Sequence, residues 1–265
     1  MRFAKAHAYG NDFLYVSETL VAGVALDQLA RQICDRHTGV GADGLVVYDR
    51  RGASVVMRLL NSDGSRAEVS GNGVRALGAL MLLDEADVDR ELVVETEAGP
   101  RLLTRTAREG AHQTFRTAMG APRHVTEVTI EAAGEPVQAV VMDLGNPQCV
   151  VLGPLPQPER FARLGAAIER HPLFPNRTNV EFAEVEALDR VRILIWERGC
   201  GATMSSGTGS CAALVAAAQA GGANRDAEVI APGGSQHVTW DATGVYLTGW
   251  AEVLCEGEWL RRLPR

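Results

Sequence analysis

Two serines lie in similar glycine-rich segments in opposite halves of the chain, Ser70-Gly71-Asn72-Gly73 and Ser206-Gly207-Thr208-Gly209. Each segment is followed by an apolar run, so each serine is predicted to stand at the N-terminus of a helix. The first backbone N–H groups of a helix lack intrahelical partners and favour an anion in front of them. Two such helix starts facing one cleft would hold a carboxylate from both sides, which predicts a site for a small anionic molecule.

Simpler explanations exist for several of the polar residues near these turns. Serine is a preferred helix N-cap, and capping does not exclude a second role in a site. Three asparagines, Asn61, Asn146 and Asn179, could satisfy local backbone groups as asparagines do in ordinary turns. Glu197 and Arg198 follow an apolar strand-like run; as a plain surface ion pair they would contribute little stability, and their place at a strand end favours a site role.

The cysteines and histidines do not form a metal-binding pattern. The five cysteines are odd in number and lack CxxC spacing: Cys34, Cys149, Cys200, Cys211 and Cys255. This pattern predicts a reducing compartment and no zinc site. Cys211 is expected to be inert inside the second buried helix, and Cys200 lies in a glycine turn. His37 lies in a glycine-rich segment, where we expect a structural role.

Composition restricts the class of protein. The chain has 265 residues, of which 46% are hydrophobic and 22% charged, as in ordinary globular proteins. A net charge of −7 without a basic block argues against a nucleic-acid partner. The apolar runs are too short to span a bilayer, and the N-terminus lacks an apolar signal core. We therefore expect a cytoplasmic protein with no membrane partner.

The elements that position the two turns follow the same order in each half: strands, an amphipathic helix, more strands, the serine turn and a buried helix. Strands are predicted at residues 54–60, 91–96, 125–130, 137–144 and 191–196. Amphipathic helices are predicted around residues 26–33 and 158–168, the second opened by Pro158. The helices after Ser70 and Ser206 are apolar nearly all round, so we expect them to be central.

This repeated order predicts an α+β fold of two similar domains related by a pseudo-twofold axis. Each domain is expected to be a mixed or antiparallel sheet wrapped around its central buried helix. We place the first domain at residues 1–115, joined by a C-terminal strand near residues 255–265, and the second at residues 116–254. Because clefts between domains are common ligand sites, we expect the site in the interdomain cleft.

Short motifs run nearly end to end along the chain. They are Gly10-Asn11-Asp12-Phe13, residues 36–44, Asn61-Ser62-Asp63-Gly64, Gly71-Asn72-Gly73-Val74-Arg75, Gly145-Asn146-Pro147, Asn179-Val180-Glu181-Phe182, Glu197-Arg198-Gly199 and Gly207-Thr208-Gly209. In this order and spacing, they resemble diaminopimelate epimerase and the wider family of cofactor-independent amino-acid racemases. The Gly-Asn-Gly turn favours the diaminopimelate branch, because proline racemases resemble one another in carrying Gly-His there.

The resemblance implies an isomerase that uses neither a metal nor a pyridoxal cofactor. In the family, one cysteine thiolate removes the α-proton of an amino acid and a second thiol delivers a proton to the opposite face. Helix N-termini hold the α-carboxylate and stabilise the enolate-like charge. The resemblance also implies a homodimer that acts on an amino acid of the lysine and meso-diaminopimelate pathway.

This sequence departs from the family at the proton-transfer positions. Ser70 and Ser206 replace both cysteines, Gln148 stands where the family usually has histidine, and Ala202 where it usually has glutamate. Glu197 is kept as the acidic partner of the second thiol. A thiol has a pKa near ~8.5 that falls at a helix N-terminus, whereas a serine hydroxyl is far less acidic. The two-thiol mechanism therefore cannot operate here as written.

The resemblance assigns roles residue by residue. The catalytic positions it implies are Ser70, Ser206, Glu197 and Gln148. The residues implied to bind the amino and carboxylate groups of the substrate's distal end are Asn11, Asn61, Asn146, Asn179 and Arg198. The residues implied to hold the reacting α-carboxylate through backbone N–H groups are Gly71, Asn72, Gly207 and Thr208.

Three functions are compatible with this pattern. The first is a diaminopimelate epimerase-like isomerase that acts at the α-carbon of a diamino dicarboxylic or related amino acid. The second is a lyase or dehydratase of the same fold, in which Glu197 would be the base. The third is a catalytically inactive amino-acid-binding homologue. Engineered cysteine replacement is a weaker explanation, because Gln148 and Ala202 have changed as well.

Overall fold

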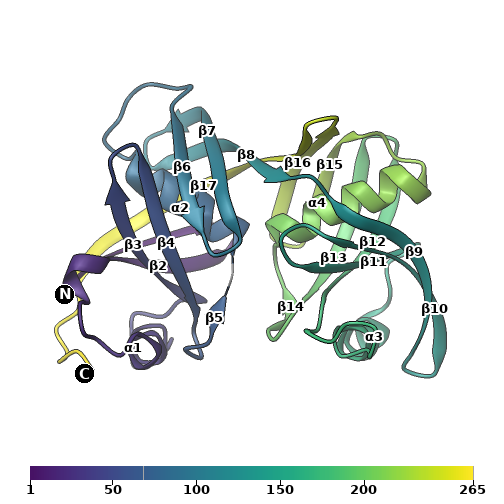
Figure 1. Cartoon of the computed structure of the whole chain (residues 1–265), viewed down its shortest axis with the longest axis horizontal. Helices are drawn as coiled ribbons and strands as arrows, with labels where there is room; N and C mark the ends of the chain where they lie inside the picture. The colour runs from purple at the N-terminus through teal and green to yellow at the C-terminus, as the bar shows by residue number, and fades with distance from the viewer. Residues whose placement is uncertain (68, 265) are drawn as a thin grey trace. The chain divides into compact units, whose positions relative to one another are not determined.

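The computed structural model describes residues 1–67 and 69–264, and Figure 1 shows their path. The chain divides into two compact units. Unit 1 comprises Met1–Thr117 and Gly249–Arg265, and unit 2 comprises Ala118–Thr248. Both boundaries fall inside strands, β8 (His112–Gly120) and β17 (Gly244–Glu258), so the end of the chain completes unit 1.

Unit 1 is a mixed sheet with one buried helix and one outer helix. Its elements are β1 (Arg2–Ala8), β2 (Asn11–Ser17), the 3-10 turn η1 (Glu18–Leu20), α1 (Leu26–Ile33), β3 (Gly44–Arg51), β4 (Ser54–Asn61), β5 (Arg66–Ala67), α2 (Gly71–Met81), β6 (Glu91–Thr96), β7 (Gly99–Glu109) and the start of β8. The pairs β2–β3 and β4–β6 are parallel, because a helix-bearing connection joins each pair. β17 pairs with both β1 and β8, which closes the sheet around α2.

The sheet of unit 1 is covered on both faces. Val74 and Leu77 of α2 pack in the inner cluster with Phe115, and Leu29 of α1 packs in the outer cluster with Leu14. Successive strand residues point to opposite faces, so a strand covered on both sides is apolar at every position. The four apolar residues of β2, from Phe13 to Val16, are accordingly all buried.

Unit 2 repeats this order. Its elements are β9 (Arg123–Ala132), β10 (Glu135–Asp143), β11 (Pro147–Leu152), α3 (Pro158–Glu169), β12 (Asn179–Ala187), β13 (Arg190–Glu197), β14 (Gly201–Thr203), α4 (Gly207–Ala216), the π-helical turn η2 (Ala217–Gly221), β15 (Asp226–Ala231), β16 (Gly234–Asp241) and the start of β17. The pairs β11–β12 and β13–β15 are parallel, at the same steps of the order as in unit 1.

The core of unit 2 forms around α4, which is buried at every position from Gly207 to Ala216. On the other face of the sheet, Leu164 and Ile168 of α3 pack against Phe182. α2 and α4 each lie among the strands of their own unit in Figure 1. The predicted α+β fold, with a sheet around a buried helix in each half, is confirmed. β10 ends at Asp143, one residue before its predicted end, where the chain turns into Gly145.

Candidate functional site

The start of α2 in unit 1 is a capped helix N-terminus. Ser70 has an extended backbone, and its Oγ accepts a hydrogen bond from Gly73 N at 3.1 Å. The simple prediction of a serine N-cap is therefore confirmed. Gly71 and Asn72 are buried in the first turn. Their backbone N–H groups are those that a helix leaves without an i−4 acceptor, so this end of α2 suits an anion.

A chain of amide contacts links this helix start to β2. Asn72 donates through Nδ2 to Asn11 Oδ1 at 3.3 Å, and Asn11 donates through Nδ2 to Asp43 Oδ2 at 2.8 Å. Arg75, whose side chain is fully buried, donates to Asn72 Oδ1. The structure thus brings together Asn11 and Asn72, two of the predicted binding residues, and fixes both amides.

A charged cluster of Lys5, Asp12, Arg36 and Asp43 lies next to Asn11, whose amide donates to Asp43. Asp12 is ion-paired with Arg36 at 2.7 Å and with Lys5 at 2.9 Å, and Arg36 also contacts Asp43 at 2.8 Å. Burial alone would raise the pKa of Asp12, but the hydrogen bonds from Arg36 and Lys5 outweigh it and lower that pKa. Asp12 is therefore ionised at neutral pH, in a partly buried site that two cations hold.

Asn61 lies at the end of β4 and is engaged by its own turn. Its Nδ2 donates to Ser65 Oγ at 2.9 Å, and its backbone N–H donates to Ser65 O at 2.8 Å. This is the local turn role that the sequence left as an alternative. The register of β3 and β4 pairs Asn61 with Gly44. Asn61 therefore lies at the same end of the sheet as Asp43, which precedes Gly44 in the chain.

The start of α4 in unit 2 is capped in the same way. Ser206 has an extended backbone, and its Oγ accepts from Gly209 N at 3.1 Å. Ser210 Oγ adds a bond by donating to Ser206 O at 2.8 Å. Thr208 Oγ1 accepts from Asn146 Nδ2 at 3.3 Å. Gly207 and Thr208 are buried at the helix start, so this end also suits an anion.

Gln148 contacts three of the other predicted site residues of unit 2, Asn146, Asn179 and Thr208. It is fully buried at the start of β11, and its strand register pairs it with Asn179 on β12. One end of its amide lies 2.6 Å from Asn146 Oδ1 and 3.2 Å from both Thr208 Oγ1 and Asn179 Nδ2. The other end lies 3.1 and 3.2 Å from the two carboxyl oxygens of Glu181.

Glu197 and Arg198 end β13 in a turn that other residues hold in place. Asn179 Oδ1 accepts from Arg198 N at 2.9 Å, and the Arg198 guanidinium donates to Asn176 O at 3.4 Å. The buried carboxylate of Glu169 accepts from Gly199 N and from Trp196 Nε1, both at 3.0 Å. Asn179 and Glu169 thus set the direction in which this turn leaves the strand.

Sequence reasoning missed four carboxyl groups of these two regions: Asp12, Asp43, Glu169 and Glu181. Asp12, Asp43 and Glu181 lie inside the quoted motifs, where the asparagines drew attention instead. Glu181 is fully buried between Val180 and Phe182. An acid inside an apolar strand is the signal that could have identified it, because a buried carboxyl needs a partner or a proton.

Burial makes three of the cysteines inert, Cys34, Cys149 and Cys211. Cys211 is fully buried in α4, as predicted. Burial, with a contribution from Glu181, raises the pKa of Cys149. Within residues 1–67 and 69–264, no group of three or more His, Cys, Asp and Glu side chains is arranged to hold a metal ion. No helix in the described part of the chain is long and apolar enough to cross a membrane.

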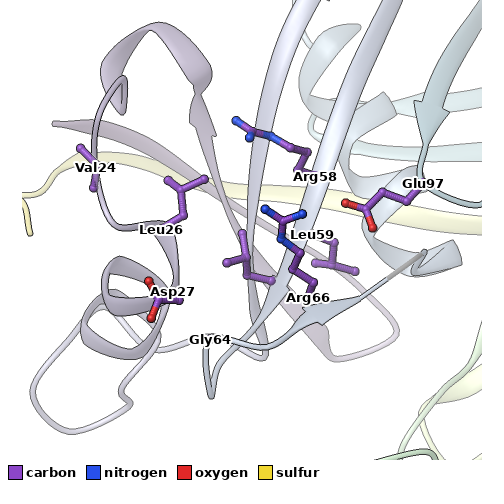
Figure 2. A pocket seen from close by; sticks show the side chains of 9 residues that line it. Val24, Leu26, Asp27, Arg58, Leu59, Gly64, Arg66 and Glu97 are labelled. Atoms are coloured by element: carbon purple, nitrogen blue, oxygen red, sulfur yellow. The ribbon is translucent and has the colours of Figure 1, made fainter. Parts of the chain in front are cut away.

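A cavity of about 270 Å³ lies in unit 1, where the first residues of α1 line it and no residue of α2 or α4 does. Figure 2 shows Val24, Leu26 and Asp27 on one side of it and Arg58, Arg66 and Glu97 on the other. Its remaining lining residues are Leu59, Leu60 and Gly64. The predicted site residues do not line it, although Gly64 belongs to the turn that engages Asn61.

Comparison with known proteins places these motifs in a family. A family model described as diaminopimelate epimerase matches residues 3–125 and 140–254. The chain is 36% identical to a diaminopimelate epimerase of Desulfovibrio desulfuricans, an alignment that covers 98% of both chains. It is 38% identical to a diaminopimelate epimerase of Desulforudis audaxviator, over 98% of this chain and all of that protein, 100%.

Solved structures share the fold at low sequence identity. A predicted epimerase from Pseudomonas aeruginosa matches with a TM-score of 0.76 and 12% identity, over 98% of this chain and 99% of that one. A probable proline racemase from Agrobacterium radiobacter K84 matches with a TM-score of 0.74 and 17% identity, over 97% of this chain and 92% of that one. These likenesses concern the fold of the chain.

Proposed function

Because the chain belongs to the diaminopimelate epimerase family, we propose that it is an isomerase acting at the α-carbon of a diaminopimelate-like amino acid. The observation that carries the proposal is the pair of serine-capped helix starts, α2 and α4, each with its first turn buried and lined by amides. A helix start of this kind stabilises a carboxylate and the negative charge that develops on it when the α-proton leaves.

The proposed roles are those that the family resemblance implies, residue by residue. Ser70 and Ser206 occupy the two proton-transfer positions, and Glu197 is the acidic group that assists Ser206. The backbone N–H groups of Gly71, Asn72, Gly207 and Thr208 hold the α-carboxylate. Asn11, Asn61, Asn146, Asn179 and Arg198 bind the distal end, with Gln148 positioned among the amides of unit 2.

Proton transfer through the two serine hydroxyl groups is expected to be the slow step of the proposed reaction. A serine hydroxyl forms far less anion at neutral pH than a thiol does, and general acid–base catalysis weakens as the pKa of the group departs from the working pH. We therefore propose a low exchange rate for the natural chain, with substrate binding retained. The homodimer and the cytoplasmic location that the family resemblance implies are part of the same proposal.

Deuterium exchange tests the proposal directly. The protein is incubated in heavy water with meso- or LL-diaminopimelate, and deuterium at the α-carbon is followed by mass spectrometry. We expect slow incorporation by the natural chain and at least about a 100-fold increase in the Ser70→Cys/Ser206→Cys variant, because both proton carriers then ionise. Ser235→Cys, which adds a thiol at an exposed position of β16, is the matched control and leaves the rate unchanged.

Two results would contradict the proposal. One is the absence of exchange in the double thiol variant when circular dichroism finds its fold intact. The other is a mass change corresponding to loss of water or ammonia, which would identify the lyase or dehydratase alternative. Ligand-induced thermal stabilisation without exchange in any variant would identify an amino-acid-binding protein.

A further inference from the structure

Glu181 is a buried carboxyl group to which the proposed chemistry gives no role. It is fully buried on β12, and its two oxygens lie 3.1 and 3.2 Å from one end of the Gln148 amide. On its other side, a Cβ placed on Gly209 would come within 2.6 Å of Glu181 Oε1. The carboxyl group is therefore enclosed between Gln148 and the first turn of α4.

The electrostatic surroundings of Glu181 favour its neutral form. Burial raises its pKa well above the ordinary value, and the negative charge of Glu197 on β13 raises it further. A second titratable group near it is the thiol of Cys149 on β11, whose own pKa is raised. Both neighbours are acids, so neither stabilises a second negative charge.

The protonation state of Glu181 determines which way the Gln148 amide turns. A protonated carboxyl group donates its hydrogen to Gln148 Oε1, which leaves Gln148 Nε2 to donate to Asn146 Oδ1 at 2.6 Å. An ionised carboxyl group only accepts, so the amide turns over and Nε2 donates to Glu181. Gln148 Oε1 then accepts from Thr208 Oγ1 and Asn179 Nδ2, both at 3.2 Å. Because the same oxygen would face Asn146 Oδ1 at 2.6 Å, the Asn146 amide turns over with it and donates through Nδ2.

The two amide directions place the Thr208 hydroxyl hydrogen differently. With Glu181 protonated, Thr208 Oγ1 accepts from Asn146 Nδ2 at 3.3 Å, and its hydrogen is available to a ligand. With Glu181 ionised, that hydrogen is donated to Gln148. We propose that Glu181 is a positioning residue which sets, through Gln148, whether Thr208 directs its hydroxyl hydrogen toward a ligand carboxylate at the start of α4. This inference rests on the proposed function for the identity of the ligand.

Nuclear magnetic resonance of the full chain tests the amide step without any ligand. The side-chain NH₂ signals of Gln148, assigned by their loss in Gln148→Met, are followed from pH 5 to pH 9.5. We expect one transition in the natural chain, none in Glu181→Gln, and a transition at lower pH in Glu197→Gln. Glu228→Gln on β15, an exposed position, is the control that leaves the transition unchanged. If Glu181→Gln does not fold, the carboxyl ¹³C signal of Glu181 in the natural chain must follow the same transition.

Calorimetry with meso-diaminopimelate tests the consequence for binding. We expect at least a tenfold loss of affinity as pH rises through the Gln148 transition, and an affinity in Glu181→Gln that does not follow that midpoint. A Gln148 signal that does not titrate, or that titrates equally in Glu181→Gln, overturns the proposal. Titration without diaminopimelate binding supports the role of Glu181 and contradicts the proposed substrate. Diaminopimelate binding without titration of the Gln148 signal supports the proposed substrate and contradicts the role of Glu181.

Discussion

The start of α2 in unit 1 and the start of α4 in unit 2 have the same cap but different supporting carboxyl groups. In unit 1, Asp12 contacts Arg36 and Lys5, and its pKa is lowered although the group is partly buried. In unit 2, Glu181 is fully buried beside an amide and another acid, and its pKa is raised. Burial acts in the same direction on both carboxyl groups, so the neighbouring cations account for the difference.

This difference gives the two units opposite responses to pH. A carboxyl whose folded pKa is lowered adds stability above its unfolded pKa and loses it as pH falls through the folded pKa. A carboxyl whose folded pKa is raised adds stability below its unfolded pKa and loses it as pH rises toward the folded pKa. The contribution of Asp12 to the free energy of unfolding is therefore lost in acid, and that of Glu181 is lost in alkali. The two helix starts thus have the same fold around them but differ in the charge state of the nearby carboxyl group.

The largest expected effect is that of Glu181→Gln at alkaline pH. Glutamine keeps the shape of the protonated carboxyl and cannot ionise. Relative to the natural chain, the variant should gain about 1.4 kcal/mol of unfolding free energy for each pH unit above ~4.3, until the natural Glu181 itself ionises. Urea unfolding at pH 5 and pH 8.5 measures this gain. An equal difference between the two chains at both pH values would show that Glu181 is ionised throughout.

Asp12→Ala should have the next largest effect, with the opposite dependence on pH. It removes the shared acceptor of Lys5 and Arg36, of which the Lys5 side chain is partly buried and the Arg36 side chain is exposed. We expect a loss of about 2 to 3 kcal/mol at neutral pH. The loss shrinks as pH falls below ~3.9, because the unfolded chain then binds a proton that folded Asp12 takes up only at lower pH. Asp27→Ala breaks the exposed pair with Arg31 and should cost under about 1 kcal/mol. Similar losses in both variants would contradict the importance of burial at Asp12.

Some of this contrast could be predicted from sequence, and some could not. Ser70 and Ser206 were recognisable as caps because a serine before glycines and an apolar run is a local signal. The burial of α2 and α4 followed from their apolar composition. Whether Glu181 is buried depends on α4, which packs over β12 but lies 26 residues or more further along the chain. The pattern of residues within a strand carries no information about such a distant contact. The tie between Asn61 and Ser65 is a choice among side-chain partners that only coordinates reveal.

The space around the two helix starts can be compared at Gly73 and Gly209, the third residues of α2 and α4. A Cβ on Gly209 would lie 2.6 Å from Glu181 Oε1, whereas the nearest atom to a Cβ on Gly73 is Ser70 Cβ at 3.3 Å. Gly209→Ala should cost about 2 kcal/mol through overpacking. In Gly73→Ala, the gain in helix propensity of up to about 1 kcal/mol offsets the tight contact, so little change is expected. Thermal unfolding of both variants measures the contrast, and equal losses would contradict the enclosure of Glu181.

The smallest expected effects concern the caps themselves. Ser70→Ala and Ser206→Ala each remove the acceptor of one backbone N–H, at Gly73 and at Gly209, and each should cost about 1 kcal/mol. Ser206 is the more buried of the two, and its Gly209 N–H is left without an acceptor inside the core, so its loss should be the larger. Ser→Gly at the same positions separates cap chemistry from packing, because glycine is itself a tolerated N-cap and costs only a few tenths of a kcal/mol relative to serine. If Ser206→Gly were as destabilising as Ser206→Ala, the packing of the side chain, and not its hydrogen bond, would distinguish the start of α4 from that of α2.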